Sequence, residues 1–234
     1  MINSRSLIVL VLAGISTTAH ANEWKGEGEL GWTMTSGNTD TENLVGALSV
    51  SKETEKWLHS GSLELLNAAT DGTRTAERYI GSGKTQYKYT EKSYSYLSLR
   101  YENDRFSGFD YRATLAVGVG TRFIENETQT LDGSIGVGVA RTKLKVSGDT
   151  SDEAVLRLDG RYTHKLSASA SFSQDVLIEA GSDNTYAESV TGLRVNINSS
   201  LATRISYTVK HNTDAPSDTD KTDTVSAVTL VYSF

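Results

Sequence analysis

Apolar and polar residues alternate along most of this chain with a period of two. In residues 111–123, the odd positions hold apolar side chains such as Leu115, Val117 and Val119, and the even positions hold small or basic residues. The same pattern returns in residues 131–139, 156–162 and 201–209. Such alternation predicts antiparallel strands with one apolar and one polar face, and by itself it does not distinguish a protein core from lipid behind the apolar face.

Segments of alternating residues separated by turn residues predict about twelve strands. Their expected ranges are 24–35, 41–52, 57–70, 75–90, 93–103, 109–124, 128–144, 153–164, 167–180, 186–198, 200–212 and 222–234. Several exceed the length of about 5 to 6 residues that is usual for strands in globular proteins. Strands of this length suit the wall of a membrane barrel.

The connections between the predicted strands alternate in character. Segments rich in Gly, Asn or Asp, such as 104–108 and 213–221, alternate with tighter links such as 91–92 and 125–126. Outer-membrane barrels have an even number of antiparallel strands, longer extracellular loops and short periplasmic turns. The sequence therefore predicts an all-β antiparallel transmembrane barrel with both termini in the periplasm.

The N-terminal segment predicts export. Arg5 precedes an apolar run over residues 7–15, and the small residues that follow end in Ala19-His20-Ala21. A basic start, a short apolar core and an A-x-A site are typical of a cleaved signal peptide, because about 20 apolar residues would be needed for a membrane-spanning helix. We expect residues 1–21 to be a signal peptide and residues 22–234 to form the barrel.

The C-terminal strand carries an expected assembly signal. Val228, Leu230, Tyr232 and Phe234 are apolar at a spacing of two, which resembles the strand that bacterial outer-membrane proteins present to the barrel-assembly machinery. Aromatic residues near other strand ends, such as Trp24, suit the two interfaces of a bilayer. The alternative is the final strand of a secreted β-sandwich that binds a partner through its loops.

Composition narrows the classes of partner and site. A net charge of -6 disfavours binding to nucleic acid. The chain has no cysteine, so neither a disulfide scaffold nor a thiolate metal site is available to it.

Three segments, 31–39, 101–112 and 118–123, carry a family resemblance. They resemble the salt-induced outer-membrane protein family of Gram-negative bacteria, a family built on a domain of unknown function, and the resemblance covers nearly the whole mature chain. It implies a monomeric barrel in contact with outer-membrane lipid and lipopolysaccharide, and the family name suggests a response to salt. It supplies no catalytic residue.

The polar face of the strands holds the charges that we expect to face the lumen, because a basic residue facing lipid costs about 2 to 4 kcal/mol at the bilayer midplane. The principal lumen-facing candidates are Arg78, Arg100, Arg112, Arg122, Arg157, Asp159, Arg161, Arg194 and Arg204. Further charges in the same phase are Lys84, Lys88, Lys210, Glu102, Asp132, Asp175, Glu179 and Glu188. Such an interior is either a network that fills the lumen or the lining of a narrow water path with a weak preference for anions.

We predict no catalytic, cofactor-binding or metal-binding residue. His211, near the acidic residues Asp214, Asp218, Asp220 and Asp223, is the one candidate for a hydrolase site at the rim. The function we favour is an outer-membrane barrel, not an enzyme, with a structural or envelope and salt-stress role and a largely occluded lumen. The alternatives are a narrow pore for small polar or anionic solutes, a rim hydrolase and a secreted β-sandwich.

Overall fold

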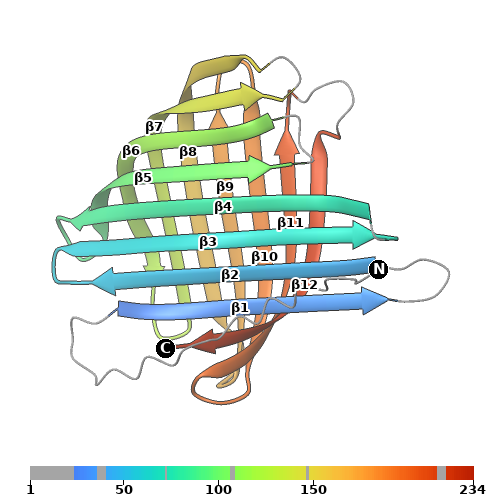
Figure 1. Cartoon of the computed structure of the whole chain (residues 1–234). Coiled ribbons are helices and arrows are strands. Elements are labelled where there is room, and N and C mark those ends of the chain that lie inside the picture. Colours follow the sequence, from blue (N-terminus) through green and yellow to red (C-terminus); the bar gives the residue numbers. More distant parts are fainter. Residues whose placement is uncertain (1–23, 36–40, 72, 106–108, 146–147, 215–219) are drawn as a thin grey trace.

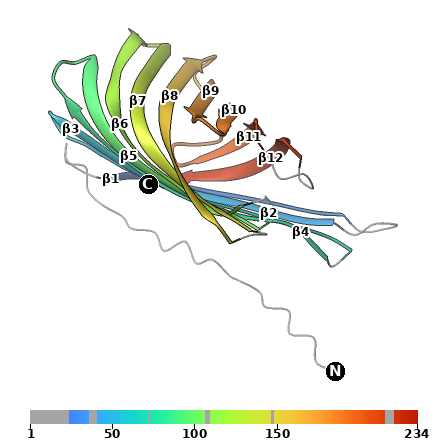
Figure 2. The same cartoon turned by 90° about the horizontal axis from the view of Figure 1, so that it is seen from above.

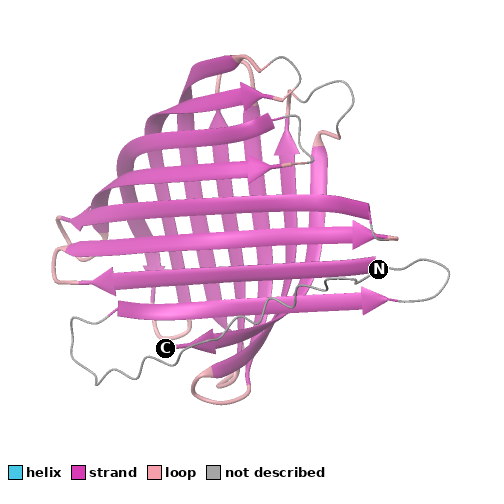
Figure 3. Ribbon diagram, viewed as in Figure 1, coloured by secondary structure: helices cyan, strands magenta, loops and turns pink. Residues whose placement is uncertain are grey.

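The computed structural model describes residues 24–35, 41–71, 73–105, 109–145, 148–214 and 220–234, so the expected signal peptide lies outside the described residues. The described part contains twelve strands and no helix (Figure 3). The strands are β1 (Trp24–Thr35), β2 (Thr41–Glu53), β3 (Trp57–Thr70), β4 (Thr73–Lys88), β5 (Ser93–Asp104), β6 (Phe109–Glu125), β7 (Gln129–Leu144), β8 (Thr150–Lys165), β9 (Ala170–Ala180), β10 (Thr185–Asn196), β11 (Leu201–Asn212) and β12 (Thr222–Ser233).

The sheet closes on itself. Every strand pairs antiparallel with its neighbours in chain order, and β12 returns to pair with β1 (Figures 1 and 2). The predicted all-β antiparallel barrel is confirmed, and the closed sheet excludes a two-sheet sandwich. Observed strand bounds lie within three residues of the predicted ones. The largest shifts are at β8, which begins earlier because Thr150 pairs with Lys143, and at β9, which begins later because the Ser167 hydroxyl accepts the N–H groups of Ser169 and Ala170.

The two ends of the barrel differ in their connections. One end, here the turn end, carries Trp24, Phe234 and five connections of three or four residues, and the other, here the loop end, carries the remaining connections, including residues 213–221. Each turn-end connection contains a short polar side chain that accepts the N–H three residues ahead at 2.8–3.0 Å; these residues are Thr54, Thr90, Asn126, Ser167 and Asn198. Such side chains mimic a backbone turn, so the sequence itself stabilises this end of each hairpin.

The outer surface of the barrel carries large apolar side chains around its circumference. Leu115 on β6, Val137 on β7 and Leu156 on β8 are all exposed, and so are the aromatic residues Trp57 and Phe123 near the turn end. We call this surface the apolar belt. A contiguous apolar surface of such extent is rare on a protein that is surrounded by water.

Glycines on β6 and β7 make room for two buried tyrosines. Gly118 and Gly120 pair with Tyr96 and Tyr94 of β5, whose rings lie against them. A methyl group on Gly118 would lie 2.7 Å from Cε1 of Tyr96 and 2.6 Å from the Cα of Gly136. Gly118 and Gly120 therefore form a floor, here the glycine floor, on which the two rings pack.

The contact between β1 and β12 is shorter than the other ladders. Its register runs from Glu27–Ser233 to Leu30–Leu230, and Gly26 and Phe234 extend it by exchanging backbone hydrogen bonds of 2.8 and 2.9 Å. Among the described residues, no backbone pair joins the two strands beyond that point, and the arrowhead of β1 lies apart from the start of β12 (Figure 1). The backbone of Val228 still lies against Gly31, where an added Cβ would be 2.6 Å from the Val228 carbonyl oxygen. We call residues 32–35 and 222–227, beyond that contact, the parted seam.

The glycine floor yields a stability prediction. We expect Gly118→Ala to lower the free energy of unfolding by about 1 to 3 kcal/mol, because the added methyl group meets the backbone of β7 and must displace it. Urea unfolding of the detergent-folded protein, followed by tryptophan fluorescence, measures the change. Gly160→Ala is the matched control, since a Cβ at Gly160 meets no atom within 4 Å. Equal stabilities for the two variants would contradict the packing role of Gly118.

Candidate functional site

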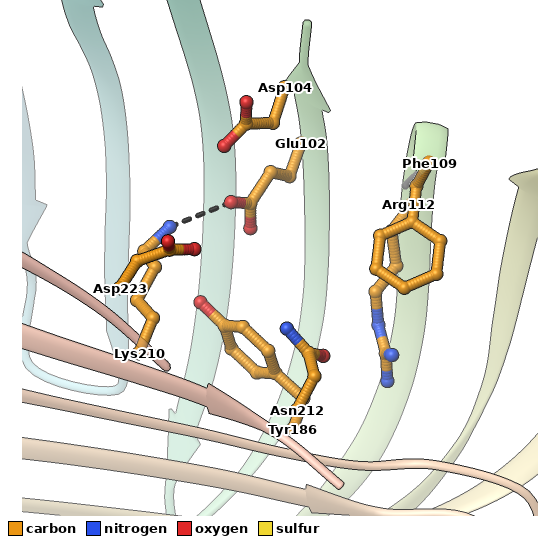
Figure 4. A pocket seen from close by; sticks show the side chains of 8 residues that line it. All are labelled: Glu102, Asp104, Phe109, Arg112, Tyr186, Lys210, Asn212 and Asp223. Atoms are coloured by element: carbon orange, nitrogen blue, oxygen red, sulfur yellow. Dashed lines mark hydrogen bonds and ion pairs between the residues drawn. The ribbon is translucent and has the colours of Figure 1, made fainter. Parts of the chain in front are cut away.

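Charged side chains meet across the interior of the barrel. Nζ of Lys210 on β11 lies 2.7 Å from Oε1 of Glu102 on β5 (Figure 4). These two strands are six places apart in the closed order of twelve, so the ion pair joins opposite walls. Such a contact passes through the centre of the barrel.

Five residues form what we call the cross-barrel cluster: Arg100, Glu102, Tyr186, Glu188 and Lys210. Arg100 forms an ion pair with Glu102, and its Nη2 lies 3.1 Å from Oε2 of Glu188 on β10. The Tyr186 hydroxyl donates a hydrogen bond of 2.5 Å to the same Glu188 oxygen. The Lys210 ammonium also lies 3.3 Å from Glu188, so each cation contacts both carboxylates.

A second group, the Glu179 cluster, joins β6, β8 and β9. Glu179 is 1 % exposed, and its carboxylate accepts hydrogen bonds from Arg157 at 2.7 Å, Thr114 at 3.0 Å and Arg112 at 3.3 Å. Arg157 also binds Asp159 with two bonds of 2.8 and 3.1 Å. Burial of an ion is costly unless opposite charges and hydrogen bonds compensate it. Here the guanidinium groups of Arg112 and Arg157 and the Thr114 hydroxyl compensate the buried carboxylate.

The ring of Tyr186 joins the two clusters. Its centroid lies 5.3 Å from the guanidinium carbon of Arg100, 5.5 Å from that of Arg112 and 5.9 Å from Nζ of Lys210. A cation within about 6 Å of a ring centroid is attracted to the negative face of the ring. One buried tyrosine therefore contacts cations from β5 and β6 on one wall and from β11 on the other.

The cross-barrel cluster lies near the loop end, since Glu102, Tyr186 and Lys210 are each within two residues of that end of their strands. A cavity of about 30 Å³ remains beside it, lined also by Asp104, Phe109, Arg112, Asn212 and Asp223 (Figure 4). A volume of this size holds about two water molecules.

The turn-end half of the interior is more accessible to water. Arg161 on β8 pairs with Asp175 at 3.2 Å, yet its side chain is 67 % exposed. Ser60 and Ser82, on the same face as the clusters, are exposed as well. Toward the loop end, ion pairs therefore cross the interior between β5 and β11, and the turn-end half is open to water.

The candidate lumen residues fall into three groups. Arg100, Arg112, Arg157 and Asp159 take part in the two clusters. Arg194 and Arg204 pair with Glu27 and Glu29 of β1 at 2.6 and 2.8 Å, and Arg161 pairs with Asp175. Arg122 binds Glu125 of its own strand at 2.7 Å, and Arg78 is paired in register with Asp104.

Sequence analysis assigned no role to Tyr94, Tyr96 and Tyr186, nor to Glu27 and Glu29. The two tyrosines of β5 have the same parity as Arg100, and Tyr186 has the same parity as Glu188. Extending the period-two phase to every residue of these strands, aromatic ones included, would have found them.

The expected assembly residues Val228, Leu230 and Phe234 are exposed on the outer face of β12, and Tyr232 stacks on Phe234 with ring centroids 6.2 Å apart. His211 contacts Thr222 through Nδ1 and Oγ1 at 2.9 Å, whereas Asp223 pairs in register with the inward Lys210. The histidine and this carboxylate therefore lie on opposite faces of the sheet.

Two searches of the described ranges gave no site. No helix there is both long and apolar enough to cross a membrane. No group of three or more His, Asp or Glu residues in the same ranges could hold a metal ion.

Comparison with known proteins gives a family and a fold. Residues 28–234 match the family described as "Protein of unknown function, DUF481". The uncharacterized protein YdiY of Escherichia coli (strain K12) is 26% identical over 212 residues, which cover 88% of this chain and 82% of YdiY. The NanC porin is 14% identical, with a TM-score of 0.51 over 90% of this chain and 98% of the porin, and the KdgM porin in complex with disordered oligogalacturonate is 9% identical with a TM-score of 0.49 over 90% and 99%. The similarity to NanC extends to the fold alone.

The Glu179 cluster yields a second stability prediction. Glu179→Gln leaves two buried guanidinium groups without their shared carboxylate, so we expect it to lower the free energy of unfolding by about 3 kcal/mol. Asp152→Asn is the matched control, because it removes a bidentate pair with Arg141 that is exposed to solvent, and we expect little change. Urea unfolding in lipid vesicles compares the two. A Glu179→Gln protein as stable as the Asp152→Asn protein would show that the cluster contributes no net stability.

Proposed function

This chain belongs to the DUF481 family, and from that membership and the closed barrel we propose that it is an integral outer-membrane protein, not an enzyme, whose lumen is occluded near the loop end. Its role is structural, within the envelope. The family resemblance of the sequence adds a link to salt stress.

The apolar belt supports the membrane assignment. Trp24, Trp57 and Phe123 lie toward one end of the belt, and Trp32 and Tyr101 lie toward the other, all exposed on the outer face. Outer-membrane barrels carry aromatic girdles of this kind at both edges of an apolar band. In this proposal the turn end faces the periplasm, residues 1–21 are cleaved after export, and the strand that ends in Phe234 is presented to the assembly machinery.

The observation that carries the occluded lumen is the ion pair between Lys210 and Glu102. Together with Arg100 and Glu188, it places two cations and two carboxylates across the barrel in mutual contact. A solute could pass only if these four side chains separated, and each would then lose its partners. Breaking one buried pair costs about 3 to 5 kcal/mol. A solute that binds weakly cannot supply that free energy.

A narrow pore for small polar or anionic solutes is the second candidate. The observation in its favour is the accessible turn-end half of the interior, where Arg161, Arg194 and Arg204 lie. In that case the cross-barrel cluster acts as a gate, and it must separate for transport.

Conductance across a planar bilayer tests the occluded lumen. We expect the wild-type barrel to give no reproducible unitary steps, and we expect the double variant Glu102→Ala, Lys210→Ala to give them, since it removes both side chains of the bridge without leaving one charge unpaired. The matched control, Arg141→Ala with Asp152→Ala, removes an exposed pair elsewhere and should leave the barrel silent. Anion-selective steps from the wild type would favour the pore instead. A change in gel mobility on boiling verifies that every variant is folded.

A further inference from the structure

One accessible cavity inside the barrel is lined largely by aliphatic side chains. Near the loop end, side chains that share the inward parity of the charged residues are aliphatic on β2, β3, β4 and β12. These residues, which we call the apolar chamber, are Val45, Leu66, Ala68, Ala76, Val225 and Ala227. Together with the polar residues Asn43, Thr224 and Ser226, they line a cavity of about 270 Å³. Aliphatic side chains that line an accessible part of the lumen depart from the apolar-out, polar-in rule for such barrels.

The apolar chamber lies directly behind the parted seam. Gly31 and Trp32 of β1 and Val228 of β12 belong to the lining of the same cavity. Trp32 is 64 % exposed and Val228 is 57 % exposed on the outer wall. Because Gly31 and the Val228 carbonyl are in contact, the cavity can reach the surface that carries the apolar belt only above them, between residues 32–35 and 222–227.

The parted seam is costly inside a membrane. Backbone N–H and C=O groups that lack partners in hydrocarbon cost several kcal/mol each, and full ladder pairing avoids this cost. The register of the intact part, extended upward, would pair residue 33 with residue 227 and residue 35 with residue 225. Neither segment contains a proline that would prevent this pairing. The two strands are thus able to close, and the open arrangement needs an occupant with polar groups for the strand edges and an apolar part for the chamber.

We propose that the parted seam is a lateral port through which the alkyl chain of an amphipathic, lipid-like molecule of the outer leaflet reaches the apolar chamber. The proposal rests on the outer-membrane assignment made above. A cavity of about 270 Å³ is near the lower end of the range of about 300 to 1,000 Å³ that is usual for small-molecule sites. It fits a hydrocarbon chain, while the polar head stays at the open strand edges near the loop end.

Photolabelling at residue resolution tests the port. The protein is reconstituted in phospholipid vesicles that contain a fatty acid with a diazirine in its chain, and labelled residues are identified by mass spectrometry after irradiation. The sequence offers matched neighbours on opposite faces: Val45 and Leu66 face the chamber, and Leu44 and Leu65 face outward. We expect label on all four residues. Label on the outward pair alone would overturn the port and leave the membrane assignment standing, whereas absence of label from both faces would overturn both.

A disulfide lock supplies the second arm. Thr33→Cys with Ala227→Cys introduces the only two thiols of the chain at positions that the extended register pairs. After oxidation we expect label to be lost from Val45 and Leu66 and retained on Leu44 and Leu65. Addition of a reductant should restore the label on Val45 and Leu66. The control, Ser62→Cys with Ser82→Cys, links two strands that are already paired and whose hydroxyls lie 2.8 Å apart, and it should leave the pattern unchanged.

Two results of the lock would overturn the proposal. Chamber labelling that persists in the oxidised protein would mean that the chain arrives through the lumen rather than through the seam. Disulfide-linked dimers of the single variant Ala227→Cys would instead assign the seam to a strand of a second copy. Gel mobility before and after boiling confirms that the locked protein is folded, so that loss of label reports access.

Discussion

Closure of the sheet is the constraint on which the rest of this structure depends. Once β12 hydrogen-bonds to β1, each side chain of the strands has only two environments, the outer wall or the interior. The period-two sequence divides apolar from charged residues between them, so the backbone ladder and the side-chain pattern require each other. The charges then have little choice of partner except one another, and the short distances across the barrel follow.

Much of the fold could be predicted from the sequence because the signal repeats in every strand. The alternation around Leu115 and Val117, and the short polar residues that begin the turns, are local properties, and they place the strands within a few residues. The partners of the inward charges are different. Whether Lys210 meets Glu102 or another carboxylate depends on the tilt and stagger of strands on opposite walls, and these quantities have no local signature.

The aliphatic residues of the apolar chamber could be identified from the sequence, whereas the parted seam could not. Leu66, Val225 and Ala227 place aliphatic side chains in the phase that holds the charged residues, as Val155 and Leu177 do on other strands. A comparison of phases would have marked all of these positions, and it would not have shown which of them line a cavity. The separation of β1 from β12 beyond Gly31 depends on the whole closed sheet, because each of the two segments pairs fully with its other neighbour. The aliphatic lining of the chamber and the interrupted pairing of β1 with β12 lie at the same place. Departures from the rules of stable folding are expected at functional sites.

The backbone bonds between Gly26 and Phe234 have a consequence for the order of assembly. These residues are separated by nearly all of the described sequence, so their pairing closes the longest loop in the molecule, and the entropic cost of closing a loop rises with its length. Every other ladder joins strands that are consecutive along the chain. The hairpins can therefore form one after another from their turns as an open, curved sheet. Pairing of the first strand with the last is then the slow final step, and it is also the ladder with the fewest backbone hydrogen bonds.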